Sequence, residues 1–262
     1  MKRSIFYNSS QLREIFHLEF LRWFGRKINM KFFAVKGGAN LRFFFQSRRY
    51  SEDLDLDITG VQAHHLKDTV MKIFQTPAFQ NNFPAFGIEK IGLPGISKAK
   101  QTETTQRFKI HLITSAREDL FSKIEFSRRG MKGTVEPQFV SESILREYGM
   151  PPLLVPHYDL LSTIFQKIEA LAARFEVQAR DIFDVHVLSS QYGGDPRKIP
   201  VSDAKLGKAK ERLFEVGFPQ FRDTVLAYLT SEDRVNYDSP PLWDEIKLKV
   251  AQFFEKIRKE NV

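Results

Sequence analysis

The sequence predicts an α+β fold, in which a mixed β-sheet with helices is followed by a C-terminal helical region. Three observations support this prediction. Short apolar or alternating segments, typical of strands, recur in the first half of the 262-residue chain. Helical apolar periodicity occurs between them, over residues 9–29 and 61–75. After a cluster of prolines at residues 151–156, the remaining apolar patterns are helical.

The predicted strands differ in what their two faces carry. The segment Asp53–Ile58 alternates strictly, so its three aspartates share one face and its apolar residues share the other. Over Leu120–Ser127, Lys123 and Glu125 lie on one face and the residues Leu120, Ser122, Ile124 and Phe126 on the other. Further strands are expected over Lys31–Lys36, Phe86–Ile91 and Arg107–Ile113. A sheet built from these strands can place Glu125 beside the aspartate strand.

The helical region begins near Tyr158 and carries charged residues on apolar faces. Lys167 falls at the edge of an apolar stripe, where its ammonium can reach a site or extend to water. On the next helix Asp181 projects among apolar residues, and burying it without a partner would cost several kcal/mol. It must therefore meet a cation, a helix N-terminus or a polar site, and Arg174 or Arg180 can supply the cation. We expect a first domain over residues 1–150 and this helical domain over 151–262.

Composition restricts the partners and the chemistry. A net charge of +8 and a pI near 9.5 favour polyanions such as nucleotides, tRNA or other nucleic acid. The chain contains no cysteine, which excludes disulfides and zinc–thiolate sites, so oxygen or imidazole must hold any metal. No signal-peptide pattern and no run of eighteen apolar residues is present, so we expect a cytoplasmic protein without a membrane span.

The most informative stretch runs from Val35 to Gly60. Gly37 and Gly38 end an apolar strand and permit a tight turn. This turn can have a purely structural role, or it can bring backbone N–H groups to a phosphate. A basic loop with Arg48, Arg49 and Ser51 follows, and then the aspartate strand. Neighbours on one face of a strand are roughly 6.6 Å apart, so the carboxylates repel one another. A hard cation bridging two of them relieves the repulsion, as in Mg²⁺-dependent phosphate chemistry.

Two motifs in this order resemble a known family. K-G-G-A-N-L-R, beginning at Lys36, precedes R-Y-S-E-D-L-D-L, and the segment Lys167–His186 carries a K-x-x-A-L-x-x-R and an R-D-x-x-D pattern. Together they are similar to the AbiEii family of the nucleotidyltransferase superfamily, the toxin half of type IV toxin–antitoxin and abortive-infection systems. The resemblance extends from about Phe32 to Leu188. It implies a nucleotidyltransferase-like mixed sheet whose active-site cleft is completed by the helical domain.

The resemblance also implies a reaction and its cofactors. A nucleoside monophosphate would pass from an NTP to an acceptor, RNA such as tRNA or a protein, with Mg²⁺ or Mn²⁺. Asp53 and Asp55 would hold the metal, with Glu125 as the third ligand; the alternative for Glu125 is an exposed acid beside Lys123. Asp57 lies outside the two-carboxylate motif and is either exposed or supports it. A cognate antitoxin protein is the implied partner.

The remaining roles concern the nucleotide. Gly37 and Gly38, helped by Arg42 or Arg49, would seat the phosphates, and the resemblance adds Ser51 and Asp184 to the nucleotide site. Lys167 would stabilise triphosphate charge, and Asp181 would position it or the acceptor. Residue 39 is alanine where relatives often carry a hydroxyl, so phosphate contact would fall to backbone N–H groups or to Asn40.

Two alternatives to this enzyme remain. The fold can serve as a non-catalytic RNA- or protein-binding module, although carboxylates in its own cleft would not help it bind a polyanion. The same site can also act as a phosphotransferase that moves the terminal phosphate of the NTP.

Overall fold

The computed structural model describes residues 7–92 and 101–258. The N-terminal residues 1–6, in which no signal-peptide pattern is expected, lie outside the described residues. The chain divides into two compact units, which are described separately. Unit 1 comprises the residues up to Phe44 together with Tyr50–Tyr158; unit 2 comprises Phe45–Arg49 and the residues from Asp159 onward. The chain passes from unit 1 to unit 2 after Tyr158, eight residues beyond the predicted boundary at residue 150, and Arg48 and Arg49 of the basic loop lie in unit 2 while Ser51 lies in unit 1.

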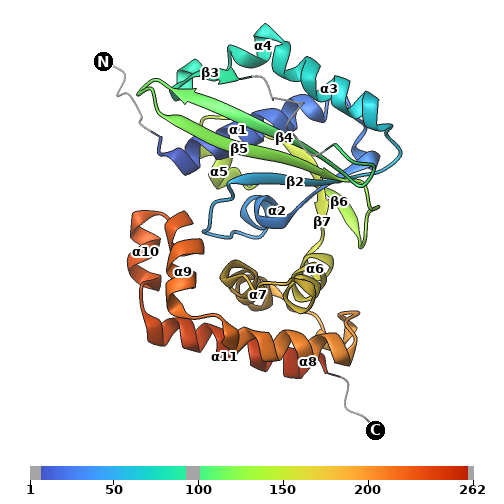
Figure 1. The fold of residues 1–262 in the computed structure, drawn as a ribbon, viewed down its shortest axis with the longest axis vertical. Coiled ribbons are helices and arrows are strands. Elements are labelled where there is room, and N and C mark those ends of the chain that lie inside the picture. The colour runs from blue at the N-terminus through green and yellow to red at the C-terminus, as the bar shows by residue number, and fades with distance from the viewer. Residues whose placement is uncertain (1–6, 93–100, 259–262) are drawn as a thin grey trace. The chain divides into compact units, whose positions relative to one another are not determined.

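Unit 1 is built on a mixed sheet, as predicted. Its strand order within the described residues is β3-β4-β5-β2-β1-β7-β6. The β2–β5 and β1–β7 pairs are parallel, and the others are antiparallel. The strand bounds are β1 Phe33–Lys36, β2 Asp53–Ile58, β3 Ile88–Gly92, β4 Thr105–Thr114, β5 Asp119–Ser127, β6 Val135–Phe139 and β7 Leu154–Tyr158 (Figure 1).

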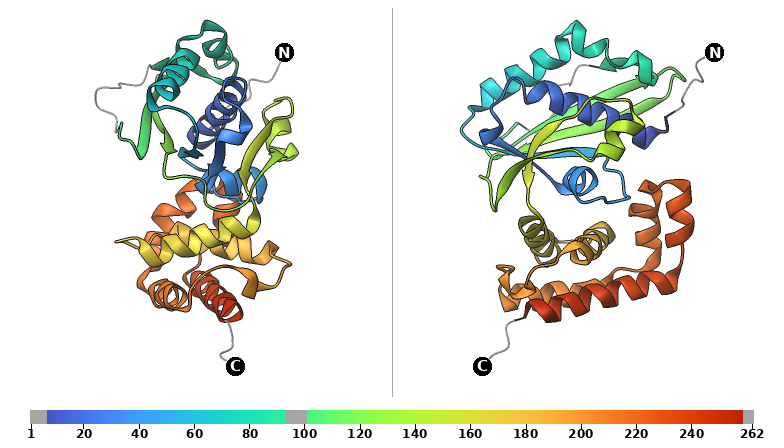
Figure 2. Two further views of the ribbon diagram at one scale, coloured as in Figure 1. Left: turned by 90° about the vertical axis from the view of Figure 1, so that its right-hand side faces the viewer. Right: turned by 180° about the vertical axis from the view of Figure 1, so that it is seen from behind.

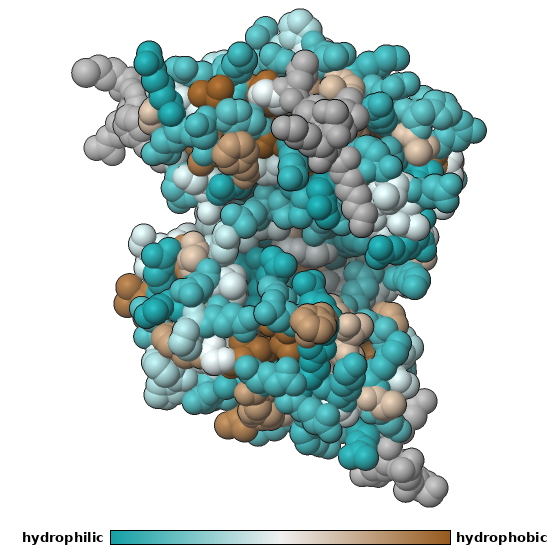
Figure 3. Space-filling model, in the orientation of Figure 1, coloured by the Kyte–Doolittle hydropathy of each residue, from teal (hydrophilic) through white to brown (hydrophobic). Residues whose placement is uncertain are grey.

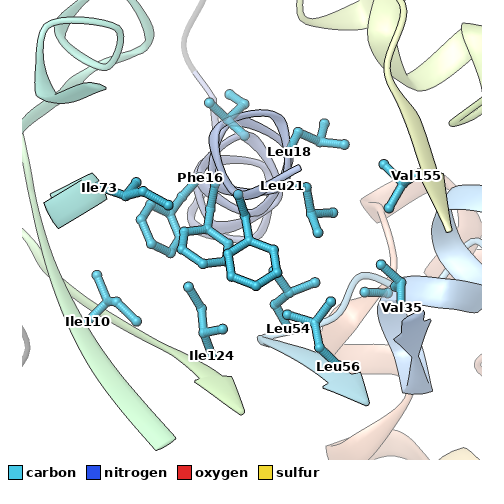
Figure 4. Close-up of a cluster of buried hydrophobic side chains, with 14 of the residues drawn as sticks. Phe16, Leu18, Leu21, Val35, Leu54, Leu56, Ile73, Ile110, Ile124 and Val155 are labelled. Atoms are coloured by element: carbon cyan, nitrogen blue, oxygen red, sulfur yellow. The ribbon is translucent and has the colours of Figure 1, made fainter. Parts of the chain in front are cut away.

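Helices α1 (Ser9–Phe24) and α3 (Ala63–Gln75) cover one face of this sheet (Figures 1 and 2). Asn8 and Gln11 form a capping box at the start of α1, which ends at Phe24, earlier than the predicted Asn29. Phe16, Leu18 and Leu21 of α1 point at apolar side chains of the strands (Figure 4). This burial fixes which face of β2 is apolar and therefore which face carries the aspartates. The shorter helices are α2 Gly37–Phe44, α4 Pro77–Gln80 and α5 Glu142–Glu147.

Strands β6 and β7 were not predicted from the sequence. Pro156 lies within β7 and pairs in register with Pro137 of the edge strand β6. Prolines cannot donate to a ladder and are tolerated mainly at edges, so their presence argued against strands here. The consequence is that Tyr158, expected to begin a helix, is the last residue of a strand in unit 1.

Unit 2 is helical. Its helices are α6 Leu160–Ala173, α7 Ala179–Gln191, α8 Asp203–Arg212, α9 Phe218–Thr224, α10 Ser231–Tyr237 and α11 Pro240–Ile257. Asp159 caps α6 by accepting from the Ser162 N–H. Trp243 of α11 stacks on Phe221 of α9 with ring centres 4.3 Å apart. Across the described residues, no helix has both the length and the apolar character needed to cross a bilayer.

The surface of both units is mainly polar. Figure 3 shows hydrophilic side chains over most of the visible face, with scattered hydrophobic patches. The buried aromatic residues, by contrast, lie in the cores, where Phe20 stacks on Phe74 and Phe108 meets Phe126 edge to face. Packing therefore accounts for many of the chain's 25 phenylalanines, although Phe121, Phe139 and Phe175 are exposed.

Candidate active site

The site in unit 1 is one face of β2 and β5. In the parallel β2–β5 ladder, Asp53 pairs with Lys123 and Asp55 with Glu125. Residues in register point to the same side of a sheet, so Asp53, Asp55 and Glu125 share one face, as predicted. The opposite face carries Leu54, Leu56 and Ile124, which are fully buried. The alternation of the sequence thus places the acidic side chains by burying the apolar ones.

The three carboxylates are not equally neutralised. Asp53 is 2.8 Å from the Lys123 ammonium, and Glu125 lies 2.6 Å from the Arg107 guanidinium. Within the described residues no side chain donates a hydrogen bond to Asp55 or forms an ion pair with it. Burial, together with the charge of Asp53, raises the pKa of Asp55, and Lys123 opposes that shift only in part. Asp55 is therefore a carboxylate whose charge is poorly balanced by protein groups.

The uncompensated charge of Asp55 bears on whether a divalent cation fits the site. Two adjacent carboxylates on one face, one of them without a protein partner, suit a hard cation that takes oxygen ligands. The third predicted ligand differs from expectation, because Arg107 holds the Glu125 carboxylate. Accordingly, no group of three carboxylate or imidazole side chains in residues 7–92 and 101–258 is arranged to hold a metal. The residues present fit a cation at Asp53 and Asp55, and Glu125 would have to leave Arg107 to join them.

Gly37 lies directly against this pair. Its φ of +67° belongs to the left-handed region, which favours glycine. A Cβ placed on Gly37 would be 2.9 Å from Oδ2 of Asp55, closer than real Cβ contacts come. Glycine is thus required at position 37 for its backbone and for its lack of a side chain. The turn brings the N-terminus of α2 next to the carboxylates.

Asp57 supports the site and is not exposed. It is buried, with the Lys36 ammonium 2.6 Å from Oδ1 and the Tyr158 hydroxyl donating to Oδ2 at 2.6 Å. Burial and the bond to Asp57 raise the pKa of Tyr158, which keeps it a hydrogen-bond donor. Tyr158 and Lys36 therefore anchor β7 and β1 to the acidic strand.

The other polar residues around the glycine turn are occupied by the fold. The Arg42 guanidinium binds Glu14 at 2.7 Å and lies over the Tyr50 ring, so in this structure it serves the packing of α2 on α1. Asn40 is buried and links α2 to β7 by donating to the Tyr158 carbonyl. Ser51 donates to the carbonyl of Asp53 and closes the turn before β2. In this structure the side chains of Arg42 and Asn40 therefore contact protein groups.

Unit 2 contains a buried charge network at the second motif. Lys167 lies 2.6 Å from Asp184 and 3.0 Å from Asp181. Arg49 binds Asp184 at 3.1 Å, and Arg174 approaches Asp181 at 2.9 Å. Asp181 does meet a cation, as its position on an apolar face requires. Three cations surround two carboxylates, so the network is positive by one charge.

The network shifts the ionisation of its members. Burial alone would lower the pKa of Lys167, but Asp184 and Asp181 outweigh burial and leave that pKa raised. Burial alone would raise the pKa of Asp184, but Arg49 and Lys167 leave it lowered. Lys167 is therefore charged and Asp184 is ionised at neutral pH. The structure brings Arg49, Lys167, Asp181 and Asp184 together, although the sequence separates Arg49 from the others by more than a hundred residues.

Sequence reasoning missed Lys36, Arg107 and Tyr158. Lys36 directly precedes the glycine pair, and Arg107 lies in a predicted strand, so alternation could have placed both on the acidic face. Tyr158 could not be found, because its strand was not predicted.

Comparisons with known proteins identify the family and the fold. The chain matches the family described as nucleotidyl transferase AbiEii toxin, type IV TA system, over residues 20–258. Among solved structures, it is similar to MenT4, a nucleotidyltransferase toxin from Mycobacterium tuberculosis H37Rv, with 15% identity, a TM-score of 0.62, and coverage of 95% of this chain and 84% of that one. It is also similar to JHP933 from Helicobacter pylori, with 19% identity, a TM-score of 0.54, and coverage of 97% and 93%.

At these identities the two structures support the fold alone. No curated protein matches the chain. The family match, in contrast, covers most of the sequence and includes both motifs. The chain therefore belongs to the AbiEii family of nucleotidyl transferase toxins of type IV toxin–antitoxin systems.

Proposed function

We propose that this protein transfers a nucleoside monophosphate from an NTP to a hydroxyl of an acceptor, with Mg²⁺ or Mn²⁺ held by Asp53 and Asp55. The observation that carries the proposal is the carboxylate pair on one face of β2, with Gly37 packed against Asp55. Family membership supports nucleotidyl transfer. The metal, the acceptor and the role of each residue are our proposal.

In this reaction an acceptor oxygen forms a bond to the α-phosphorus while the bond to the β-phosphate bridging oxygen breaks. Pyrophosphate leaves, and the acceptor proton passes to solvent. The cation would stabilise charge on the attacking and leaving oxygens. Asp53 and Asp55 would hold that cation, and Lys123 keeps the Asp53 carboxylate in place. Backbone N–H groups at Gly37 and Gly38 offer donors to the phosphates.

Unit 2 supplies the second set of groups. We assign Lys167 to the neutralisation of triphosphate charge and Asp181 and Asp184 to its orientation. The supporting observations are the short Lys167–Asp184 contact of 2.6 Å and the net positive charge of the network. Positioning and electrostatics, with little covalent chemistry by the protein, suffice for phosphoryl-type transfer.

The test is incubation of the full chain with α-labelled NTPs, a divalent cation and total tRNA, followed by electrophoresis. Label should move to the RNA, and Asp55→Asn should abolish the transfer. Glu52→Gln is the matched control, because Glu52 is an exposed acid beside the motif. Label on protein would assign a protein acceptor. Transfer from γ-labelled NTP alone would indicate a phosphotransferase, and no transfer from either would favour a non-catalytic module.

The type IV family also implies an antitoxin protein. We propose that a neighbouring open reading frame encodes it. Co-expression should relieve the growth defect caused by the wild-type chain, and Asp55→Asn should cause no defect to relieve.

A further inference from the structure

The edge of the unit 1 sheet at which β2 and β5 end carries cations that the proposed chemistry does not use. Because these strands are parallel, their carboxyl ends meet at the same edge. The chain leaves β2 toward His64 and His65 at the start of α3, and it leaves β5 through Arg128 and Arg129 (Figure 1). We call the set Lys27, His64, His65, Lys72, Arg128 and Arg129 the basic edge.

Two adjoining cavities form one part of the basic edge. They measure about 690 Å³ and 480 Å³ and share Lys27 and His65 as lining residues. The larger is also lined by Trp23 and Lys72, and the smaller by Phe32. No aspartate or glutamate lines either cavity. Aromatic rings beside cations, without carboxylates, suit a ligand that has both rings and negative charge.

Side-chain hydrogen bonds join the start of α3, beside these cavities, to the loop after β5. Gln106 donates to the Ala63 carbonyl at 2.9 Å and accepts from Arg128 at 3.3 Å. Further along the loop, the Lys132 N–H donates to the Tyr158 hydroxyl, which binds Asp57. Gln106 therefore links the start of α3 to the loop after β5, and Tyr158 links that loop to the acidic strand.

Among the described residues, three cations of this edge lack an acidic partner. In the described part of the chain, no carboxylate lies within ion-pair distance of Lys27, Lys72 or Arg129. Elsewhere, exposed cations such as Arg146, Lys205 and Lys249 are paired with neighbouring acids. Unpaired cations gain most from an anionic ligand, because no internal pair must be broken.

The extent of the surface indicates a chain of phosphates. His65 and Lys72 line one cavity and are seven residues apart on α3, which is about 10 Å of helix. The link through Gln106 to Arg128 extends the row further. We propose that the basic edge binds the phosphodiester backbone of a nucleic-acid acceptor, with a base against Trp23, and directs its end to the acidic face. This proposal rests on the proposed function and makes nucleic acid, not protein, the acceptor.

The test is equilibrium binding of a fluorescent single-stranded RNA to the full chain in EDTA without NTP, so that no transfer occurs. The triple variant with Lys27, Lys72 and Arg129 changed to Gln should bind about tenfold or more weakly at low salt. The slope of log K against log salt should fall by about 0.7 for each lost phosphate contact. Lys90→Gln is the matched control, since Lys90 is exposed on β3 and pairs with Ile113 at the other end of β4.

A second readout uses the fact that the chain has only two tryptophans. In a Trp243→Phe background, Trp23 is the sole reporter, and RNA should quench its fluorescence. An oligodeoxynucleotide of the same sequence separates the two sources of phosphodiester. Weaker binding of the DNA would show that the surface prefers RNA, and equal binding would show that it recognises the phosphodiester backbone common to both. Both results support the proposal.

Several outcomes overturn the inference. Unchanged affinity and salt slope in the triple variant would exclude the basic edge. Equal displacement of RNA by polyglutamate of matching charge would point to an acidic protein partner. These failures are distinguishable from failure of the proposed function, because Asp55→Asn should bind RNA at least as well as the wild type while transferring nothing.

Discussion

Gly37→Ala tests the contact between the glycine turn and the carboxylate pair. The new methyl group would strain a backbone with φ of +67°, at about 1–2 kcal/mol for a left-handed residue. It would also lie 2.9 Å from Oδ2 and 3.5 Å from Cβ of Asp55, so the whole side chain must move. Overpacking of this kind costs about 1–3 kcal/mol. We expect a total loss of about 2–5 kcal/mol in the free energy of unfolding of unit 1.

Gly149→Ala is the matched control, because Gly149 has φ of +63° and a Cβ there would meet nothing within 4 Å. Both variants share the backbone strain and the reduced entropy of the unfolded chain, so their difference isolates the clash with Asp55. Urea unfolding followed by Trp23 fluorescence in the Trp243→Phe background should give a difference of about 1–3 kcal/mol. The free energy of unfolding of each variant is compared with that of the protein that carries only Trp243→Phe.

Activity should separate the two variants more strongly. Displacing a metal-binding carboxylate by an ångström can reduce a rate about a hundredfold. We therefore expect Gly37→Ala to lose about two orders of magnitude in nucleotidyl transfer, while Gly149→Ala retains activity close to wild type. Equal stability and equal activity of the two variants would refute the assignment of Gly37 to the site.

Three further predictions concern charge. Asp55→Asn should raise the free energy of unfolding at pH 7. Burial and the charge of Asp53 raise the pKa of Asp55, so ionisation of this carboxyl group opposes folding. Urea unfolding should show that the gain in stability disappears below the ordinary carboxyl pKa of 3.8, where Asp55 is protonated in both states. Asp184→Asn should lose about 3–5 kcal/mol by urea unfolding at pH 7, because it leaves Lys167 and its neighbours underneutralised. Since the folded-state pKa of Asp184 is lowered, its contribution is present above the unfolded pKa and is lost as pH falls through the folded value. Arg107→Gln should tighten Mn²⁺ binding in calorimetric titration, because it releases Glu125 beside Asp55.

The Asp184 prediction has a control variant, and the other two predictions have outcomes that would contradict them. Lys205→Gln removes a half-exposed ion pair with Glu169 and should cost less than about 1 kcal/mol, in contrast to Asp184→Asn. A stability loss for Asp55→Asn at pH 7 would contradict the unbalanced charge assigned to Asp55. Weaker Mn²⁺ binding by Arg107→Gln would show that Arg107 supports the metal site and does not compete with it.

The local arrangement of the acidic strand was predictable from the sequence, because period-two alternation determines which side chains share a face. The alternation in Leu120–Ser127 allowed β5 to lie beside β2 but did not determine that pairing. The partners of the carboxylates were harder to predict, since ion pairs such as Glu125 with Arg107 depend on register between strands, which one sequence does not specify.

Two other features escaped prediction for identifiable physical reasons. Strand β7 contains Pro156, and proline normally argues against a strand, so the domain boundary was placed too early. From the sequence, Arg42 or Arg49 was expected to help Gly37 and Gly38 seat the phosphates. In the structure Arg49 joins Asp184 in unit 2, a long-range ion pair that no local pattern encodes.

Direct titration of divalent metal provides the sharpest test of the central claim that Asp53 and Asp55 form the metal-binding pair. Calorimetry with Mn²⁺ and a non-hydrolysable NTP analogue should show binding to the wild type and to Glu52→Gln, and its loss in Asp53→Asn and Asp55→Asn. Binding of the metal with unchanged affinity by both aspartate variants would contradict the claim, whatever their activity.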